Sequence, residues 1–536
     1  MHRSAQSWLL ATILLPILIF GVSGCSEDCD HPVVPDDGGG EVLSESISIT
    51  TQEQLEELSN VERAYGHIRI EGTEVHDLSP LSNLEYCQSL LIAGTGITTL
   101  QGLEKLEIVQ VQLSLHDNRT LRDVDALSGL TRAGRIEITR NHLLTNLDAI
   151  HHISLMSLLI EDLPEVATLG TLDAIEGLQT LSIYSCTNLT QLPPPAVLTT
   201  LNALNLRQLP VLSPGATMTG EFPLLRELKL EDLPLIEDLT GFGELPELWH
   251  LSLNNLNSLV SLAGLGRLDN LEVLYLMDLE GLASVAGLPA MPNLVRVRII
   301  DCQGLQSLSG FPDLPQLDTL DLYQLSLASL EGLPSMPNLR YLTIDLIHQL
   351  TSLSGLPSLP NLVNLRIRRC DAIDNLAGLT DSTVPWQLDV SYCPINSFGS
   401  DVDLPNCESL VLMECQQLET FAGFEVMTGI TRLRVNGCDQ LRNFSGINCP
   451  EIMESIDLEG NGDLESFDGL QGLRHLTQHL QISNHATLAT LSGFDNLETI
   501  QDIRITDNLS LPQATIIDFM AGLDSWDTAV IGGNGP

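Results

Sequence analysis

The apolar residues of this chain form short pairs that return about every 23 positions. In Leu274-Tyr275-Leu276 the two leucines alternate with an outward residue, and the same spacing recurs before and after it. Such alternation places both apolar side chains on one face of a short strand, and its regular return predicts parallel strands lying side by side. The first residues of the twenty pairs, called anchors below, are Ile68, Leu90, Leu113, Ile136, Leu158, Leu181, Leu204, Leu228, Leu251, Leu274, Val297, Leu320, Leu342, Leu365, Leu388, Leu410, Leu433, Ile456, Leu480 and Ile503.

A third inward position follows five residues after each anchor and in most coils carries asparagine, cysteine or leucine. A cysteine there acts as a small apolar residue with a weak donor, so we expect the cysteines of this column to be buried rather than paired in disulfides. Cys87 and Cys407 lie three residues before their anchors and are also expected in the core. The sequence leaves the state of Cys29 and Cys449 open. The column includes Asn118, Asn141, Asn461, Asn508, Cys186, Cys302, Cys370, Cys393, Cys415 and Cys438.

The segment behind each strand reads Leu-x-Gly-Leu or Leu-x-Gly-Phe, with glycine about thirteen residues after the anchor, as at Gly264 and Gly378. A glycine at a fixed offset indicates positive φ or close backbone packing. Leu-Pro and Met-Pro pairs follow it and disfavour regular helix. We therefore expect 3₁₀ turns and extended segments behind the strands. α-Helix is expected to be largely absent from the convex side, and the terminal caps are expected to carry helices at Thr51–Leu58 and Pro512–Leu523.

The first 45 residues differ from the repeats. An apolar run from Trp8 to Phe20 follows His2 and Arg3 and ends at Val22-Ser23-Gly24-Cys25, which resembles the lipobox of bacterial lipoproteins. That resemblance implies lipidation of Cys25 and export to the cell envelope, and Ser26 after the cysteine is typical of lipoproteins sent to the outer membrane. A eukaryotic secretory signal is the competing interpretation. The predicted layout is a signal peptide (1–24), an acidic flexible tether (25–45), an N-terminal cap (46–67), the repeats (68–510) and a C-terminal cap (511–536).

The period and the pattern Leu-x-x-Leu-x-Leu resemble the leucine-rich-repeat family. Gly66–Ile70, Val111–Asn118 and His479–Asn484 are similar to the receptor-L-domain variety, and the centre is similar to internalin-type repeats. The resemblance implies an α/β-type, right-handed horseshoe solenoid of about twenty repeats. Its parallel sheet lines the concave face, and little helix covers the convex side. It also implies a non-catalytic binding or adhesion surface.

The chain is acidic, with a net charge of −46 and two lysines against 22 arginines. Such a charge argues against nucleic acid and anionic lipid headgroups as partners. The sequence predicts no cofactor and no metal site: it lacks a P-loop lysine, and His475 and His479 cannot share one helix because a strand begins at Leu480. Weak calcium binding by the turn at Asn461-Gly462-Asp463 stays open, since turn chemistry explains that sequence equally well.

Large outward-facing residues gather in the middle coils, and aromatic residues and arginine dominate binding hot spots. We therefore expect a concave strip that binds a protein or an acidic glycan. The competing interpretation is that Arg298 beside Asp321, and Arg366 beside Asp389, form cross-strand pairs. The strip consists of Trp249, His250, Tyr275, Arg296, Arg298, Tyr323, Arg340, Tyr341, Arg366, Arg368, Arg369, Trp386 and Tyr392.

Two other functions are considered beside binding. Asp301, Asp321 and Asp345 occupy outward positions on three successive coils, where carboxylates could perform the acid–base chemistry of a β-helical enzyme acting on polysaccharide. A structural role in the envelope without a specific ligand is the third. The leucine-dominated pattern favours a non-enzymatic binding module over both.

Overall fold

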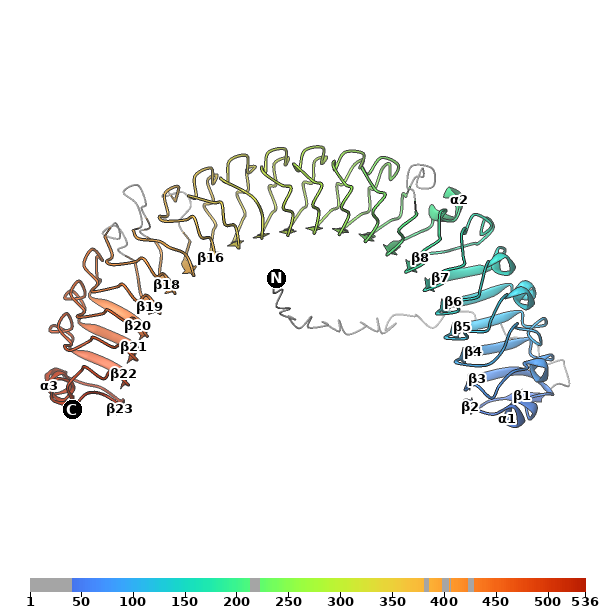
Figure 1. Ribbon diagram of the computed structural model, residues 1–536, viewed down its shortest axis with the longest axis horizontal. Helices are drawn as coiled ribbons and strands as arrows, with labels where there is room; N and C mark the ends of the chain where they lie inside the picture. The colour runs from blue at the N-terminus through green and yellow to red at the C-terminus, as the bar shows by residue number, and fades with distance from the viewer. Residues whose placement is uncertain (1–40, 213–221, 380–384, 398–403, 405, 423–428) are drawn as a thin grey trace, which may run out of the picture.

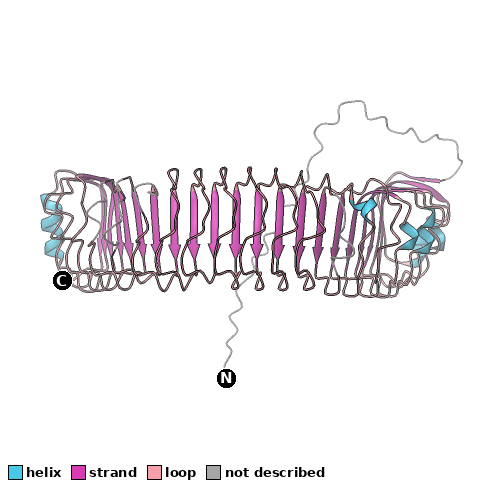
Figure 2. Cartoon of the chain, turned by 90° about the horizontal axis from the view of Figure 1, so that it is seen from above, coloured by secondary structure: helices cyan, strands magenta, loops and turns pink. Residues whose placement is uncertain are grey.

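The computed structural model describes residues 41–212, 222–379, 385–397, 404, 406–422 and 429–536. Across them the chain winds into an arc of successive coils, with the strands on the inner, concave side and the turns on the outer, convex side (Figure 1). Viewed from above, the strands lie parallel along the arc, and helix is confined to short segments, most of them near the two ends (Figure 2). No helix in the described ranges has the length and apolar character needed to cross a membrane.

Near both ends of the sheet most strands have eight to eleven residues, whereas those in its middle have five. The terminal strands themselves are short, with three residues at the N-terminal edge and five at the C-terminal edge. The end strands are β1 (Glu41–Leu43), β2 (Ile47–Ile49), β3 (Val61–Glu71), β4 (Tyr86–Ala93), β5 (Ile108–His116), β6 (Arg132–Thr139), β7 (Ser154–Glu161), β20 (Ile452–Glu459), β21 (His475–Ser483), β22 (Thr499–Thr506) and β23 (Thr528–Gly532). Five-residue strands fill the middle: β8 (Thr180–Tyr184), β9 (Ala203–Arg207), β10 (Glu227–Glu231), β11 (His250–Asn254), β12 (Val273–Met277), β13 (Arg296–Ile300), β14 (Thr319–Tyr323), β15 (Tyr341–Asp345), β16 (Asn364–Arg368), β17 (Gln387–Ser391), β18 (Ser409–Met413) and β19 (Arg432–Asn436). The helices are α1 (Gln52–Glu56), α2 (Pro195–Leu198) and α3 (Gln513–Gly522), with 3₁₀ turns η1 (Ser79–Leu81), η2 (Asp125–Gly129) and η3 (Asp148–Ile150).

Successive strands pair in parallel, anchor against anchor. Leu251 lies opposite Leu274, and Leu274 lies opposite Val297, so the side chains of one column stack along the whole sheet. All twenty anchors are at most 2% exposed. The periodicity therefore predicted both the strands and their inward face correctly. Burial of this column, at about 25 cal/mol per Å² of apolar surface, is what holds neighbouring coils together.

The column five residues after the anchors closes each coil against the next. The side-chain oxygen of Asn141 accepts a hydrogen bond from the backbone N–H of Asn118 at 3.0 Å, and its Nδ2 donates to the carbonyl of Leu115 at 2.9 Å. Both asparagines are fully buried. The residue just before this column adopts a left-handed conformation, as at Asp117 with φ of 53°. This turn lets one buried amide satisfy backbone groups of neighbouring coils.

The repeated glycine behind the strands has the predicted positive φ. Gly378 has φ of +107°, and a Cβ built there would lie 2.4 Å from the carbonyl carbon of Leu353 in the preceding coil. Both the dihedral angle and the close approach therefore require glycine. Neighbouring coils could not approach each other this closely with a larger residue.

Both caps contain the expected helices, but at the N-terminal end the sheet reaches further than predicted. Thr51 caps α1 by accepting from the N–H of Gln54, whose side chain accepts from the N–H of Thr51, each at 3.3 Å. At the other end α3 is followed by β23, which pairs with β22. The prediction of a flexible tether over 25–45 is wrong at its end: β1 pairs with β3 from Glu41 to Leu43, because β3 is long enough to pair with both β1 and β2.

The cysteine prediction is confirmed for the residues that the structure describes. Burial raises the pKa of the Cys302 thiol to about 12, so that thiol stays protonated. Cys449 is partly exposed and free. The predicted lipid site Cys25, and Cys29, lie outside the described residues. The buried free cysteines are Cys87, Cys186, Cys302, Cys370, Cys393, Cys407, Cys415 and Cys438.

Candidate functional site

The thirteen residues of the predicted strip lie on or beside strands β11 to β17, along the concave face, in five columns set by the repeat. The columns place them as follows: Trp249, Arg340 and Trp386 two residues before an anchor; His250, Arg296 and Tyr341 one before; Tyr275, Arg298 and Arg366 between the two apolar residues; Tyr323 and Arg368 after the second; Arg369 and Tyr392 in the left-handed turn. Strip members in one column and on adjacent coils are neighbours, as Tyr275 is to Arg298. Others, such as Trp249 and Tyr392, are separated by several coils.

Three aromatic rings lie close together where β11 and β12 are adjacent. The His250 ring lies 5.3 Å from Trp249 and 5.4 Å edge-on from Tyr275, measured between ring centroids. The guanidinium of Arg298 stands over Tyr275, 5.5 Å from its centroid. Burial lowers the pKa of His250, and Lys229 lowers it further, which favours a neutral imidazole. Its Nε2 is buried and has no hydrogen-bond partner among the described residues.

Apolar side chains extend this ring cluster across the concave face. Val273 and Met277 flank Tyr275 on β12, and Ile300 lies opposite Met277 on β13, all partly exposed. Tyr323 follows in the same column on β14, opposite Ile300. We call the six residues His250, Val273, Tyr275, Met277, Ile300 and Tyr323 the central patch. It is an apolar and aromatic surface within a chain whose net charge is strongly negative.

Most arginines of the strip are engaged in ion pairs with acids on neighbouring coils. The carboxylates of Asp345 and Asp389 are only 0% and 6% exposed, so these pairs are shielded from solvent on one side. The competing interpretation of the sequence, cross-strand pairing, is therefore confirmed for Arg298 and Arg366. Arg296 has no ion-pair partner in the described part of the chain. The pairs are Arg298–Asp321 at 3.2 Å, Arg340–Asp318 at 3.7 Å, Arg366–Asp389 at 3.2 Å, Arg368–Asp389 at 3.0 Å and Arg369–Asp345 at 2.6 Å.

Comparison with protein-family models gives no match, and comparison with curated proteins gives none either. Among solved structures, the TLR13–ssRNA13 complex is 16% identical and covers 92% of this chain and 80% of its own, with a TM-score of 0.34. An internalin, InlF from Listeria monocytogenes, is 19% identical and covers 60% of this chain and 86% of its own, with a TM-score of 0.30. A leucine-rich-repeat protein from Bacteroides eggerthii is 11% identical and covers 73% of this chain and 70% of its own, with a TM-score of 0.39.

The fold follows from features of the chain itself: the 23-residue period, the buried anchors, the asparagine column and the parallel concave sheet. It is a leucine-rich-repeat solenoid. Within that fold the concave face is where side chains from successive repeats converge on one surface. The side chains in the concave columns of this leucine-rich-repeat solenoid therefore determine what its candidate site can bind.

The carboxylates considered for catalysis are already engaged within the solenoid. Asp301 accepts from Gln324 at 2.9 Å, Asp321 is paired with Arg298, and Asp345 is held by Arg369. The three acids also lie in three different columns, because each stands at a different offset from its anchor. These contacts give no support to the polysaccharide-active alternative.

The leucine-rich-repeat solenoid also accounts for the residues considered as metal ligands. Asn461 is buried, and its oxygen accepts from the N–H of Cys438 at 2.9 Å while its Nδ2 donates to Val435 at 2.8 Å, so this side chain belongs to the closing column. His479 contacts Asp457 at 2.8 Å. Within the described ranges, no three His, Cys, Asp or Glu side chains are arranged to hold a metal ion.

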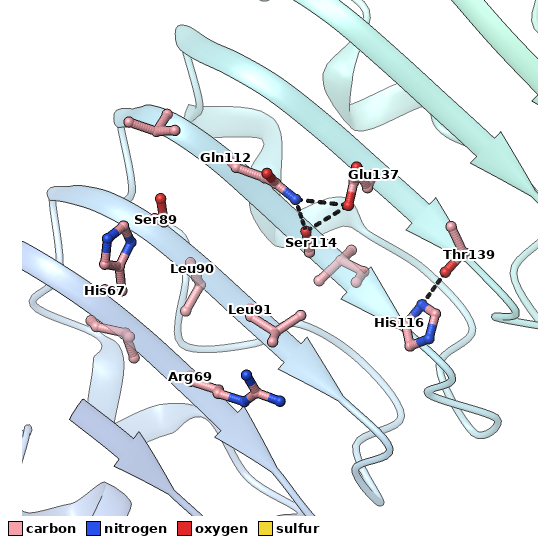
Figure 3. A pocket seen from close by; sticks show the side chains of 13 residues that line it. His67, Arg69, Ser89, Leu90, Leu91, Gln112, Ser114, His116, Glu137 and Thr139 are labelled. Carbon is pink, nitrogen blue, oxygen red and sulfur yellow. Dashed lines mark hydrogen bonds between the residues drawn. The ribbon is translucent and has the colours of Figure 1, made fainter. Parts of the chain in front are cut away.

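A second candidate site, which the sequence did not suggest, is a hollow on the concave face of the N-terminal repeats, across β3 to β6 (Figure 3). Its volume is about 430 Å³. Leu91 lies at its centre, with His67 and Arg69 from β3 on one side (Figure 3). Gln112, Ser114 and Glu137 form a hydrogen-bonded group on the other. We call this site the N-terminal hollow.

Sequence reasoning missed Val273, Met277 and Ile300 of the central patch and Leu91 of the N-terminal hollow. A signal for them was present: each is an apolar residue at an outward position of its strand, where the other repeats more often carry polar residues. The predicted strip was defined by arginine and aromatic residues, so it did not include these apolar residues. An aliphatic residue on the outward face of a strand is unfavourable in water unless something covers it, so it carries information of its own.

Proposed function

We propose that this leucine-rich-repeat solenoid is a non-catalytic binding module that holds a protein partner with its central patch. The observation that carries the proposal is the apolar and aromatic composition of the patch, from His250 on β11 to Tyr323 on β14. Tyrosine, methionine and arginine are enriched in the centres of protein interfaces, and lysine and acids are depleted there. Tyr275, with Arg298 above it, has the composition and position of a binding hot spot.

The ion pairs favour a protein over an acidic glycan as the partner. An anionic polysaccharide needs free cations, whereas Arg298, Arg366, Arg368 and Arg369 are neutralised by buried or half-buried acids. Removing an arginine from such a pair would leave an uncompensated carboxylate. Charge reversal at these positions would therefore report on stability before it reported on binding.

The test uses a photo-crosslinking amino acid at Met277, in the full-length chain in its native envelope, with the same amino acid at Glu331 on the convex side as a control. We expect a discrete adduct to a protein from Met277 only, identified by mass spectrometry. The purified partner should then bind Tyr275→Ala at least tenfold more weakly than the parent, which corresponds to about 1.4 kcal/mol. Binding unchanged by both Tyr275→Ala and Ile300→Asp would refute the proposal.

From the sequence alone, we propose that the module is exported and anchored to the bacterial envelope by lipid on Cys25, with the solenoid attached through the segment that follows. The support is the apolar run ending at Val22-Ser23-Gly24-Cys25. Metabolic labelling with a radioactive fatty acid should label the parent chain and not Cys25→Ser. Equal labelling of both, or of neither, would refute lipidation at this residue.

A further inference from the structure

The N-terminal hollow has an apolar floor. Leu91 stands in the outward column of β4, the column in which neighbouring strands carry Arg69 and Ser114. Val111, at the rim, is 47% exposed. Ser114 and Ser89 are small, which leaves the space above Leu91 empty. A volume of about 430 Å³ is in the range of pockets that hold small ligands. An aliphatic group seated here would cover Leu91 and release its hydration water.

The rim of the hollow carries polar groups that have no hydrogen-bond partner among the described residues. The ring of His67 and the hydroxyl of Ser89 have no hydrogen-bond partner among the described residues, and neither has Oε1 of Gln112. His116 uses its Nδ1 on Thr139, which leaves Nε2 available. A ring nitrogen of His67 and the hydroxyl of Ser89 can donate, and Oε1 of Gln112 can accept, so the rim suits a ligand that has both an acceptor end and an N–H group.

The charged groups around the hollow are paired, and Arg69 is the cation that an anionic ligand can reach. Glu137 is already neutralised, because Arg135 contacts it at 2.6 Å and Gln112 donates to it at 2.7 Å. Arg69 pairs with Glu71 at 2.7 Å, but both side chains are well exposed, at 56% and 35%. An exposed pair of this kind is worth little, so the guanidinium can exchange Glu71 for a ligand carboxylate. The pairs of Arg366, Arg368 and Arg369 in the middle coils differ in that their acids, Asp389 and Asp345, are buried.

We propose that the N-terminal hollow binds the C-terminal end of a peptide whose last residue is aliphatic. The aliphatic side chain lies on Leu91 and Val111, and the terminal carboxylate is held by Arg69 and His67. Oε1 of Gln112 accepts the N–H of the last residue. The hollow opens onto the concave face, so the preceding residues of the peptide leave along it. Capture of a C-terminal carboxylate is a recurring mode of peptide recognition; here side chains take the place of the backbone groups that usually hold it.

This site is independent of the central patch. About eight strands separate β4 from β12, which is roughly 40 Å along the sheet at about 4.8 Å per strand. A partner could occupy both sites, but loss of either one leaves the other intact. The chemistry of an aliphatic group beside a carboxylate is also found in free short-chain fatty acids, and the experiment separates that source from a peptide.

The experiment measures fluorescence polarisation of a labelled peptide, Gly-Ser-Gly-Ser-Ala-Leu, with the purified full-length chain. Three peptides are compared: the free carboxylate, the C-terminal amide, and a version ending in Asp. We expect saturable binding of the first and at least tenfold weaker binding of the other two. Equal binding of acid and amide, or no binding of the acid at about 1 mM, would overturn the proposal.

Variants place the binding at the hollow. Arg69→Gln and Leu91→Ser should each weaken binding about tenfold, and circular dichroism should show both to be folded. Arg504 occupies in β22 the column position that Arg69 occupies in β3, so Arg504→Gln is the matched control and should bind like the parent. Parent-like binding by Arg69→Gln and Leu91→Ser would place the peptide elsewhere and overturn the assignment. Competition by 4-methylpentanoate as strong as by the unlabelled peptide would refute the peptide as the occupant.

Discussion

His485 gives the solenoid a built-in sensitivity to acid. It occupies the closing column, where Asn461 and Asn508 stand in the neighbouring coils, and it is fully buried. Its Nδ1 accepts the backbone N–H of Asn461 at 3.1 Å, in place of an asparagine oxygen, and lies 3.2 Å from the carbonyl oxygen of the same residue. The backbone N–H of His485 donates to Oδ1 of Asn508 at 3.0 Å. Nε2 has no partner among the described residues. A second proton on this ring would therefore be buried, and Nδ1 could no longer accept.

The magnitude follows from the pKa of His485, which burial lowers from 6.5 to about 4 in the folded chain. Between these values the unfolded chain binds more protons than the folded one, so stability falls as pH drops below about 6.5 and stops falling near 4. Above 6.5 the imidazole is neutral in both states and has no effect. The linkage relation gives a loss of about 2 kcal/mol between about pH 7.5 and pH 5.

The assay is urea unfolding of the parent and of His485→Asn at both pH values. Asparagine keeps an acceptor for the N–H of Asn461 but does not titrate, so the parent should lose about 2 kcal/mol more than the variant on acidification. Hydrogen exchange of β21 and β22 localises the effect, since solenoid ends can open separately. His152→Asn, at an exposed histidine, should keep the parent's pH dependence. An equal loss in the parent and in His485→Asn would refute the reasoning.

Two further predictions concern the contacts between coils. Gly378→Ala should lower the free energy of unfolding by roughly 2–4 kcal/mol in a urea titration, because its Cβ would combine a positive φ with a clash against Leu353. Arg369→Ala should cost about 3 kcal/mol by the same measurement, because Asp345 is fully buried and would lose the guanidinium that accompanies its charge.

Matched variants separate these causes from general sensitivity to mutation. Gly177 also has a positive φ, of 73°, but nothing lies within 4 Å of its Cβ position, so Gly177→Ala should cost only about 1 kcal/mol. Arg119 is 74% exposed in its pair with Asp117, so Arg119→Ala should change stability by less than about 1 kcal/mol. If each pair of variants lost the same amount, neither the clash nor the buried charge would explain the costs.

The pattern of the sequence was sufficient for the fold because each coil repeats one local rule. Leu274 and its equivalents recur at the same offset, and every copy must bury its side chain against the next, so the register is fixed many times over. The positive φ of Gly378 and the inward position of Asn141 were predicted for the same reason, because each recurs at a fixed offset from its anchor. The extent of the sheet was less predictable: β1 pairs with β3 through backbone groups, which leave no mark on side-chain periodicity.

The candidate site was only partly visible in the sequence. The alternation of strand residues identified which side chains face the concave surface, among them Tyr275 and Arg298. It did not determine which arginines remain free, because pairing depends on the reach of side chains across coils that are 23 residues apart. Arg369 contacts Asp345, the last residue of β15 in the preceding coil, from the left-handed turn that follows β16.

The sequence by itself thus determined the solenoid, its inner face and its buried columns, since these depend on apolar residues at fixed spacing. The tertiary structure alone decided where that inner face is charged, neutralised or hollow. The N-terminal hollow exists because small Ser89 and Ser114 lie beside Leu91 on adjacent strands, a juxtaposition across coils that no local pattern encodes. The physical reason is that burial of anchors is a property of each repeat, whereas pockets and ion pairs are properties of neighbouring repeats together.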